Sequence, residues 1–95
     1  MTAYVLADIN VTDPERYEDY KVLATEAVQK YGGRYIVRGG TVEALEGECL
    51  QAPRFAVLEF TDGNAARRWY NSPEYTAARK IRQEASTARL VLVEP

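Results

Sequence analysis

Glu59 and Arg38 are the two ionisable residues whose surroundings in the sequence best suit catalysis. Glu59 lies in the apolar run of residues 55–60, and strand alternation puts it on the same face as Phe55 and Val57. A carboxylate that is partly desolvated in such a run can accept a proton from a carbon acid. Arg38 directly precedes a pair of glycines, where a backbone kink can aim its guanidinium at a carboxylate or enolate oxygen of a substrate.

The same two residues also suit a structural role. An arginine close to Glu59 would hold the carboxylate ionised in an ion pair. Arg38 can supply that partner, or it can pair with Asp8 at the end of a sheet and brace a dimer. The sequence leaves the catalytic and the structural interpretation of Glu59 and Arg38 open.

Asp8 and Asn10 are candidate ligand-binding residues because they share one face of a predicted strand, near its C-terminal end. From there they can point into a cleft between a sheet and its helices and orient a ligand. Asn10 can equally fold back onto the turn before Thr12, a local hydrogen bond that needs no ligand.

The chain is rich in tyrosine, with seven tyrosines against two phenylalanines and a single tryptophan. On helices, most such residues belong to the core or to an interface. A cleft between the sheet and the helices could also use them to hold a small aromatic or quinone-like ligand. The candidates for this role are Tyr17, Trp69, Tyr70 and Tyr75.

The chain lacks the residues on which several common catalytic mechanisms depend. The chain has no histidine, so it lacks the commonest general base and metal ligand, and its one cysteine, Cys49, cannot form an internal disulfide. No glycine-rich phosphate loop, zinc-type cluster or nucleophile elbow is present in the sequence. We therefore expect no metal and no cofactor, and we expect Cys49 to have no role in function.

Length and charge limit the possible partners. The 95 residues suit a single domain over residues 1–95, and 12 basic against 14 acidic residues give a formal charge of −2. Nucleic-acid binding is not expected without a basic excess. The absence of a long apolar stretch or a leader-like start predicts a cytoplasmic protein that does not insert into membranes.

The first half of the chain predicts a strand, a helix and a second strand. Residues 3–11 alternate in character, and the next four residues suit a helix start with Thr12 as the cap and Glu15 closing a capping box. The helix should stop at Gly32-Gly33. A strand over residues 34–38 is expected to resume over residues 41–45, with a bulge at the glycines between them.

The second half predicts a strand, a broken helix and a last strand. Residues 54–61 are apolar enough for a strand that forms a long hairpin with the preceding one. A helix opens at residues 62–64 and is interrupted at Ser72-Pro73, which provides a new cap and a first-turn proline. Residues 88–93 form the final strand.

This order predicts an α+β, ferredoxin-like βαββαβ fold, in which two helical segments cover one face of a four-stranded antiparallel sheet. The other face still carries apolar residues, and leaving them in water would expose a large patch. We therefore expect a homodimer formed through the sheet face, giving a dimeric α+β barrel.

Four blocks of sequence resemble the family called domain of unknown function 1330: residues 8–14, 31–40, 69–75 and 90–94. The resemblance extends over nearly the whole chain. It implies a ferredoxin-like subunit of the dimeric α+β barrel superfamily, which includes cofactor-independent monooxygenases, muconolactone isomerases and haem enzymes. Haem chemistry of that type commonly uses a histidine ligand, which this chain lacks.

Two functions follow as hypotheses. One is a cofactor-independent enzyme or binder of a small aromatic or carbonyl-containing metabolite, in which Glu59 removes a proton and Arg38 stabilises the oxyanion, as in a monooxygenase or an isomerase. The alternative is a non-catalytic dimeric structural or interaction module, in which the polar residues serve folding and assembly.

Overall fold

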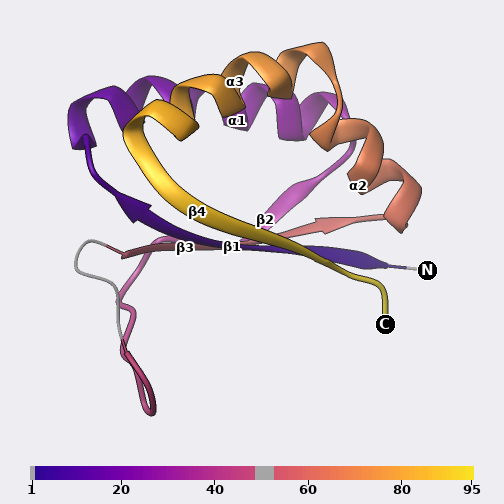
Figure 1. Cartoon of the computed structure of the whole chain (residues 1–95). Coiled ribbons are helices and arrows are strands. Elements are labelled where there is room, and N and C mark those ends of the chain that lie inside the picture. The colour runs from indigo at the N-terminus through magenta and orange to yellow at the C-terminus, as the bar shows by residue number, and fades with distance from the viewer. Residues whose placement is uncertain (1, 49–52) are drawn as a thin grey trace.

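The computed structural model of the chain describes residues 2–48 and 53–95. Cys49 lies outside them. The elements follow the order β1 (Ala3–Val11), α1 (Pro14–Lys30), β2 (Arg34–Arg38), β3 (Pro53–Phe60), α2 (Gly63–Tyr70), α3 (Pro73–Ala85) and β4 (Ser86–Val93) (Figure 1). The strands form one antiparallel sheet in the order β2-β3-β1-β4. This confirms the predicted ferredoxin-like arrangement, with the broken helix present as α2 and α3.

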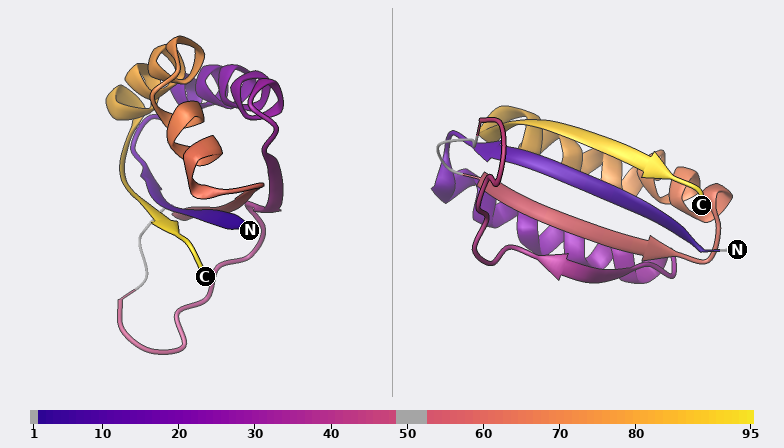
Figure 2. Two further views of the ribbon diagram at one scale, coloured as in Figure 1. Left: turned by 90° about the vertical axis from the view of Figure 1, so that its right-hand side faces the viewer. Right: turned by 90° about the horizontal axis from the view of Figure 1, so that it is seen from below.

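The sheet and the helices form two layers. Figures 1 and 2 show α1 and α3 side by side over one face of the sheet, while no helix of the described residues lies on the other face. In β1 every second residue is buried, from Ala3 to Val11, and these side chains point toward the helices. The core they form with the helices is dominated by Trp69, Tyr75 and Phe60. None of the helices in the described residues is long and apolar enough to cross a bilayer.

Local signals set most helix boundaries. Asp62 and Ser72 cap α2 and α3, accepting hydrogen bonds from the backbone N–H groups of Ala65 and Tyr75. The stop after α1 is also as predicted, with Gly32 at a φ of 76°. The cap of α1 is Asp13 rather than the predicted Thr12, and its carboxylate accepts from the N–H of Arg16 at 3.1 Å.

The segment after β2 differs from the prediction. The described residues 39–48 form no strand, so the expected continuation over residues 41–45 is wrong, and Figure 1 shows this segment projecting from the sheet on the side away from the helices. The bulge lies earlier than expected, between Tyr35 and Val37. Gly39 and Gly40 adopt positive φ where the chain leaves the sheet.

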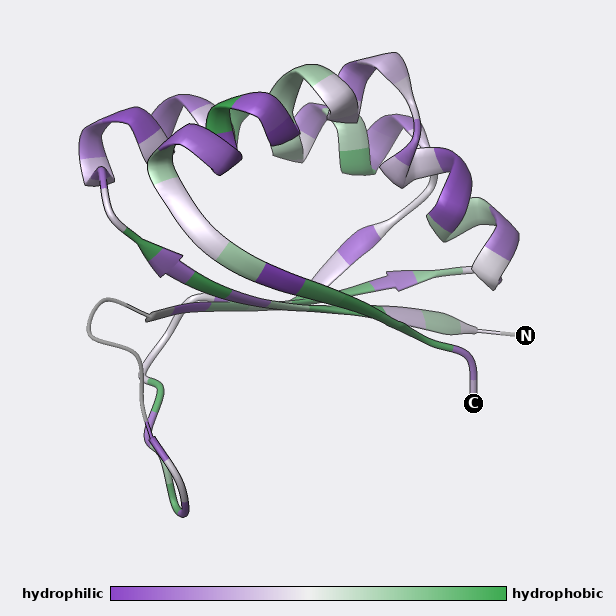
Figure 3. Cartoon of the chain, viewed as in Figure 1, coloured by the Kyte–Doolittle hydropathy of each residue, from purple (hydrophilic) through white to green (hydrophobic). Residues whose placement is uncertain are grey.

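The open face of the sheet is partly apolar. Leu6 pairs with Val57 on one side and with Val91 on the other, so these three side chains are neighbours across this face. Val91 and Val93 are each 41% exposed and Val37 is 42% exposed. Figure 3 shows hydrophobic residues along β1 and β4, and no helix or strand of the described residues covers them from below.

Candidate functional site

The candidate site is a cavity of about 220 Å³ between the sheet and the helices. All four strands contribute to it, together with α1, α2 and α3. Its lining residues are Ala7, Ile9, Tyr17, Tyr20, Lys21, Tyr35, Arg38, Gly39, Arg54, Phe55, Ala56, Leu58, Trp69, Tyr75 and Leu90.

Six aromatic residues line the cavity. The Trp69 ring lies 4.2 Å from that of Tyr75, and the Tyr17 ring lies 5.2 Å from that of Tyr20, measured between centroids. Tyr35 from β2 and Phe55 from β3 complete the set. Such rings offer broad apolar surfaces against which a flat ligand can pack.

Two tyrosine hydroxyls meet in this wall. The hydroxyl oxygens of Tyr20 and Tyr75 lie 2.8 Å apart and share a buried hydrogen bond. Burial raises the pKa of Tyr20 well above its usual range, and the neighbouring Tyr75 raises it further. Burial also raises the pKa of Tyr17, and it raises that of Tyr35 to about 12. Tyr17, Tyr20 and Tyr35 therefore stay neutral at physiological pH and act as hydrogen-bond donors rather than bases.

Arg38 bridges β2 and α1 at the mouth of the cavity. Its Nη1 donates to Thr25 Oγ1 at 2.7 Å, and its Nη2 donates to the backbone carbonyl oxygen of Lys21 at 3.2 Å. The guanidinium also stacks over the Tyr35 ring, 4.1 Å from the centroid. These contacts hold the arginine in one orientation and leave further N–H groups for a ligand.

The bulge in β2 is what turns Arg38 toward the cavity. Arg34 pairs with Glu59 in the register, whereas Arg38 pairs with Ala56, so the two arginines lie on opposite faces of the sheet. In a regular strand, residues four apart would share a face. The extra residue at the bulge reverses the alternation, as bulges next to functional sites often do.

Glu59 lies on the other face of the sheet. Its carboxylate accepts a hydrogen bond from Nε of Arg34 at 2.7 Å, and it does not line the cavity. Arg38 therefore does not approach Glu59 as expected. In a strand without the bulge, Arg38 and Glu59 would lie on the same face of the sheet. An ion pair at Glu59 is present, with Arg34 as the partner.

The remaining predicted residues divide between the two faces. Asp8 and Asn10 pair with Phe55 and Pro53 on the open face, so the expectation that they point into a cleft beneath the helices is wrong. Tyr17, Trp69 and Tyr75 line the cavity, as does Arg38. Tyr70 lies behind them, with its ring 5.8 Å from that of Tyr75.

Several cavity residues were not singled out from the sequence. Lys21, Arg54 and Ala56 line the cavity, and Tyr20 and Tyr35 were noted only as tyrosines. Strand alternation could have found Arg54, because it is four residues before Leu58 and shares its face. Lys21 lies on a helix, and no local signal distinguishes it from other surface lysines.

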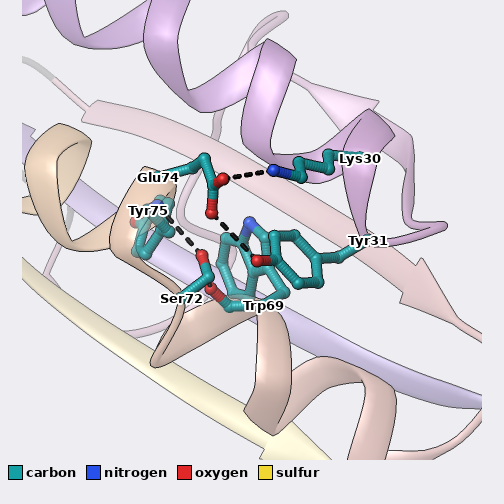
Figure 4. A network of polar contacts seen from close by, with 6 residues as sticks. All are labelled: Lys30, Tyr31, Trp69, Ser72, Glu74 and Tyr75. Atoms are coloured by element: carbon teal, nitrogen blue, oxygen red, sulfur yellow. Dashed lines mark hydrogen bonds and ion pairs between the residues drawn. The ribbon is translucent and has the colours of Figure 1, made fainter.

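A polar network closes the far side of the helical layer. Glu74 of α3 contacts Lys30, the last residue of α1, and Tyr31, which follows it. Its carboxylate accepts hydrogen bonds from Lys30 Nζ and, at 2.9 Å, from the Tyr31 hydroxyl (Figure 4). The contact with Lys30, a backbone hydrogen bond and Tyr31 together lower the pKa of Glu74 to about 2. This network ties α1 to α3 above Trp69 and Tyr75.

The described residues contain no group of three or more acidic, cysteine or histidine residues that could hold a metal ion. The cavity lining within the described part of the chain includes no carboxylate either. Its polar groups are cations and hydroxyls, which suit an oxygen-bearing organic ligand.

Solved structures share this fold. A protein of unknown function from Rhodopseudomonas palustris is 20% identical, with a TM-score of 0.79 over 99% of this chain and 82% of that chain. SnoaB, a cofactor-independent oxygenase from Streptomyces nogalater, is 15% identical, with a TM-score of 0.74 over 99% and 92%. A dimeric ferredoxin-like protein of unknown function from Jannaschia sp. is 14% identical, with a TM-score of 0.76 over the full length of both chains.

Sequence comparison identifies the family. No curated protein matches the chain. A family model described as a domain of unknown function matches residues 2–95, which is nearly the entire sequence. The chain therefore belongs to the domain of unknown function 1330 (DUF1330) family.

Proposed function

We propose that the chain binds a small aromatic or carbonyl-containing metabolite in the cavity and acts on it without a bound cofactor, as an oxygenase or an isomerase does. The observation that carries this proposal is the cavity itself, with six aromatic residues in its wall and the oriented guanidinium of Arg38 at its mouth. Concave, mostly apolar sites with a few placed polar groups are typical of small-molecule binding.

The chemistry that suits this site proceeds through an oxyanion. Loss of a proton from the carbon next to a carbonyl gives an enolate, and N–H groups of Arg38 would stabilise its oxygen. The described lining holds no carboxylate to take the proton, so the site suits an acidic carbonyl compound that releases its proton to solvent. Return of a proton from solvent to a different carbon gives an isomer of the substrate. Glu59 pairs with Arg34 on the other face, so we assign it a structural role.

The similarity to a cofactor-independent oxygenase supports the same proposal. An electron-rich enolate or phenolate held in such a cavity is also the form of a substrate that reacts with dioxygen. The shared fold does not select between oxygenation and isomerisation, because one fold carries many chemistries. Both begin with the anion that Arg38 would hold.

We also propose that the protein is a homodimer whose subunits meet through the open face of the sheet. Leu6, Val57 and Val91 lie together there without a covering element among the described residues. The similar structure from Jannaschia sp. is described as dimeric. The cytoplasmic location expected from the sequence stays a prediction.

Ligand titrations test the proposed function. Trp69 is the only tryptophan and lies in the cavity wall, so its fluorescence reports occupancy. We expect saturable quenching by at least one of catechol, benzaldehyde and benzoate, and its loss in Ala56→Leu, which fills the cavity. Ala77→Leu adds the same bulk at an exposed position of α3 and should bind as the parent does. Failure of every probe to bind, or equal binding by Ala56→Leu, would contradict the proposal.

The second candidate is a non-catalytic dimeric module. The ion pairs of Arg34 with Glu59 and of Arg67 with Glu94 favour it, since both place charged groups in structural contacts. The two candidates differ at Arg38. A module without a ligand predicts that Arg38→Gln changes only stability, whereas a ligand site predicts a change in probe affinity at unchanged fold.

A further inference from the structure

The mouth of the cavity carries positive charge that the described residues do not neutralise. Among the described residues that line the cavity, the charged ones are Lys21, Arg38 and Arg54, and none is acidic. Lys21 forms an ion pair with Glu18 at 3.0 Å. Arg38 and Arg54 form no ion pair with any described residue.

These two arginines lie on neighbouring strands and face the same side. Arg38 pairs with Ala56, and Arg54 is two residues before Ala56 on β3, so the pair is diagonal across the strands. Side chains in that relation start roughly 7–8 Å apart, within reach of one bridging anion. Both arginines also lie near the Tyr17 hydroxyl and partly offset the rise that burial causes in its pKa.

The second polar feature of the cavity, besides the arginines, is the pair of hydroxyl groups of Tyr20 and Tyr75. Their shared hydrogen bond uses one of the two hydroxyl protons, so the second proton is available to an acceptor in the cavity. Between this pair and the arginines, Tyr17, Tyr35 and Trp69 supply apolar wall. The cavity therefore has a cationic mouth, an aromatic middle and a neutral hydroxyl donor.

The size of the cavity limits the ligand to one ring. Its volume is about 220 Å³. An apolar cavity of roughly 150 Å³ in another protein accommodates benzene. Drug-sized ligands occupy pockets of roughly 300–1,000 Å³. A single ring with one or two small substituents fits between these limits.

We propose that the ligand is a single-ring aromatic carboxylate with an oxygen substituent away from the carboxylate. The carboxylate binds between Arg38 and Arg54 at the mouth, and the substituent oxygen accepts a hydrogen bond from the Tyr20–Tyr75 pair. This inference rests on the proposed function and adds to it the charge and polarity of the substrate.

Matched probes test the charge. Titration of Trp69 fluorescence compares 4-hydroxybenzoate with its neutral methyl ester in the intact protein. We expect the acid to bind roughly tenfold or more tightly, as charge-assisted hydrogen bonds to partly exposed arginines allow. Arg38→Gln and Arg54→Gln should each remove most of that preference. Arg68→Gln removes the same charge at an exposed site on α2 and should retain the preference.

A second comparison tests the hydroxyl pair. The parent protein should prefer 4-hydroxybenzoate to benzoate. The double variant Tyr20→Phe, Tyr75→Phe removes both hydroxyl protons and should reduce that preference several-fold while the acid-over-ester preference persists. Circular dichroism confirms that each variant is folded.

The outcomes separate this inference from the proposed function. Equal affinity for acid and ester in the parent, or an unchanged preference in both arginine variants, overturns the inference and leaves a cavity for neutral ligands. Absence of binding by all of these probes and by catechol and benzaldehyde overturns both. Loss of the acid preference in Arg68→Gln as well would show long-range charge rather than a site, and would also overturn the inference.

Discussion

Tyr20 and Tyr75 are 55 residues apart in sequence, and their hydroxyl oxygens lie 2.8 Å apart in the wall of the cavity. The contact joins α1 to α3, which pack side by side over the sheet. It places two hydroxyl groups in a wall of mostly aromatic and aliphatic side chains. The same pair therefore contributes to the stability of the helical layer and to the polarity of the site.

Removing one hydroxyl of this pair should cost stability. Tyr75→Phe leaves the Tyr20 hydroxyl buried without its partner, and we predict a loss of about 1 kcal/mol in the free energy of unfolding. Urea denaturation measures this loss. Tyr70→Phe is the control, since Tyr70 is half-buried and its hydroxyl forms no hydrogen bond with any described residue. A change in Tyr70→Phe as large as that in Tyr75→Phe would contradict the assignment.

The Glu74 network should make stability depend on pH in acid. The pKa of Glu74 is lowered from 4.5 to about 2 by Lys30, by a backbone hydrogen bond and by Tyr31. The Glu74 carboxylate makes its full contribution to folding stability above pH 4.5, which is its pKa in the unfolded chain. As pH falls from there toward 2, the unfolded chain binds a proton that the folded chain does not, so stability is lost.

We predict that Glu74→Gln has a shallower decrease in urea midpoint than the parent between about pH 5 and about pH 3. Glu26→Gln removes an exposed carboxylate of α1 and should follow the parent curve. Parallel curves for Glu74→Gln and the parent would show that the network contributes nothing to folding.

Gly33 is expected to tolerate no side chain. A Cβ at this position would lie 2.5 Å from Cε1 of Phe60, whose ring is 1% exposed. We predict that Gly33→Ala lowers the free energy of unfolding by about 1–3 kcal/mol, because the packed ring cannot move aside without cost.

Gly63 provides the matched comparison. A Cβ there would meet the carboxylate of Glu94 and the guanidinium of Arg67, which are flexible ends of exposed side chains. Gly63→Ala should therefore be close to neutral, within about 0.5 kcal/mol. Equal destabilisation of the two variants in urea denaturation would contradict this account of the packing at Phe60.

A charge on the open face should break the proposed dimer. Val91 is 41% exposed and shares the open face with Leu6 and Val57. We predict that Val91→Lys sediments as a monomer at micromolar concentration, while the parent sediments as a dimer. Val22→Lys places the same charge on α1, at a valine that is 62% exposed, and should remain dimeric. A monomeric parent would rule out the proposed assembly.

The sequence predicts the fold more completely than the site. Alternation in β1, the caps at Asp62 and Ser72 and the stop at Gly32 are local signals, and the structure uses them as expected. The predicted cap of α1, Thr12, was wrong because a contact between residues distant in sequence intervenes. The backbone N–H groups of Thr12 and Asp13 both donate to the Ala85 carbonyl oxygen. Local sequence does not contain such a contact.

The site was predicted less well because the register of the sheet decides it. A single bulge between Tyr35 and Val37 moves Arg38 to the helix side, so its expected contact with Glu59 is replaced by one between Glu59 and Arg34. No glycine or proline marks the bulge in the sequence. The prediction for Asp8 failed for a simpler reason. Asp8 is two residues after Leu6 in β1, so both side chains lie on the face of the sheet that no described helix covers.

The most direct test of the proposed site is an electron-density map at high resolution from crystals grown with 4-hydroxybenzoate. We predict one ring beside Trp69 and Tyr17, its carboxylate bonded to Arg38 and Arg54 and its hydroxyl close to Tyr20 and Tyr75. A cavity filled only by water, or a ring bound outside the cavity, would contradict the account.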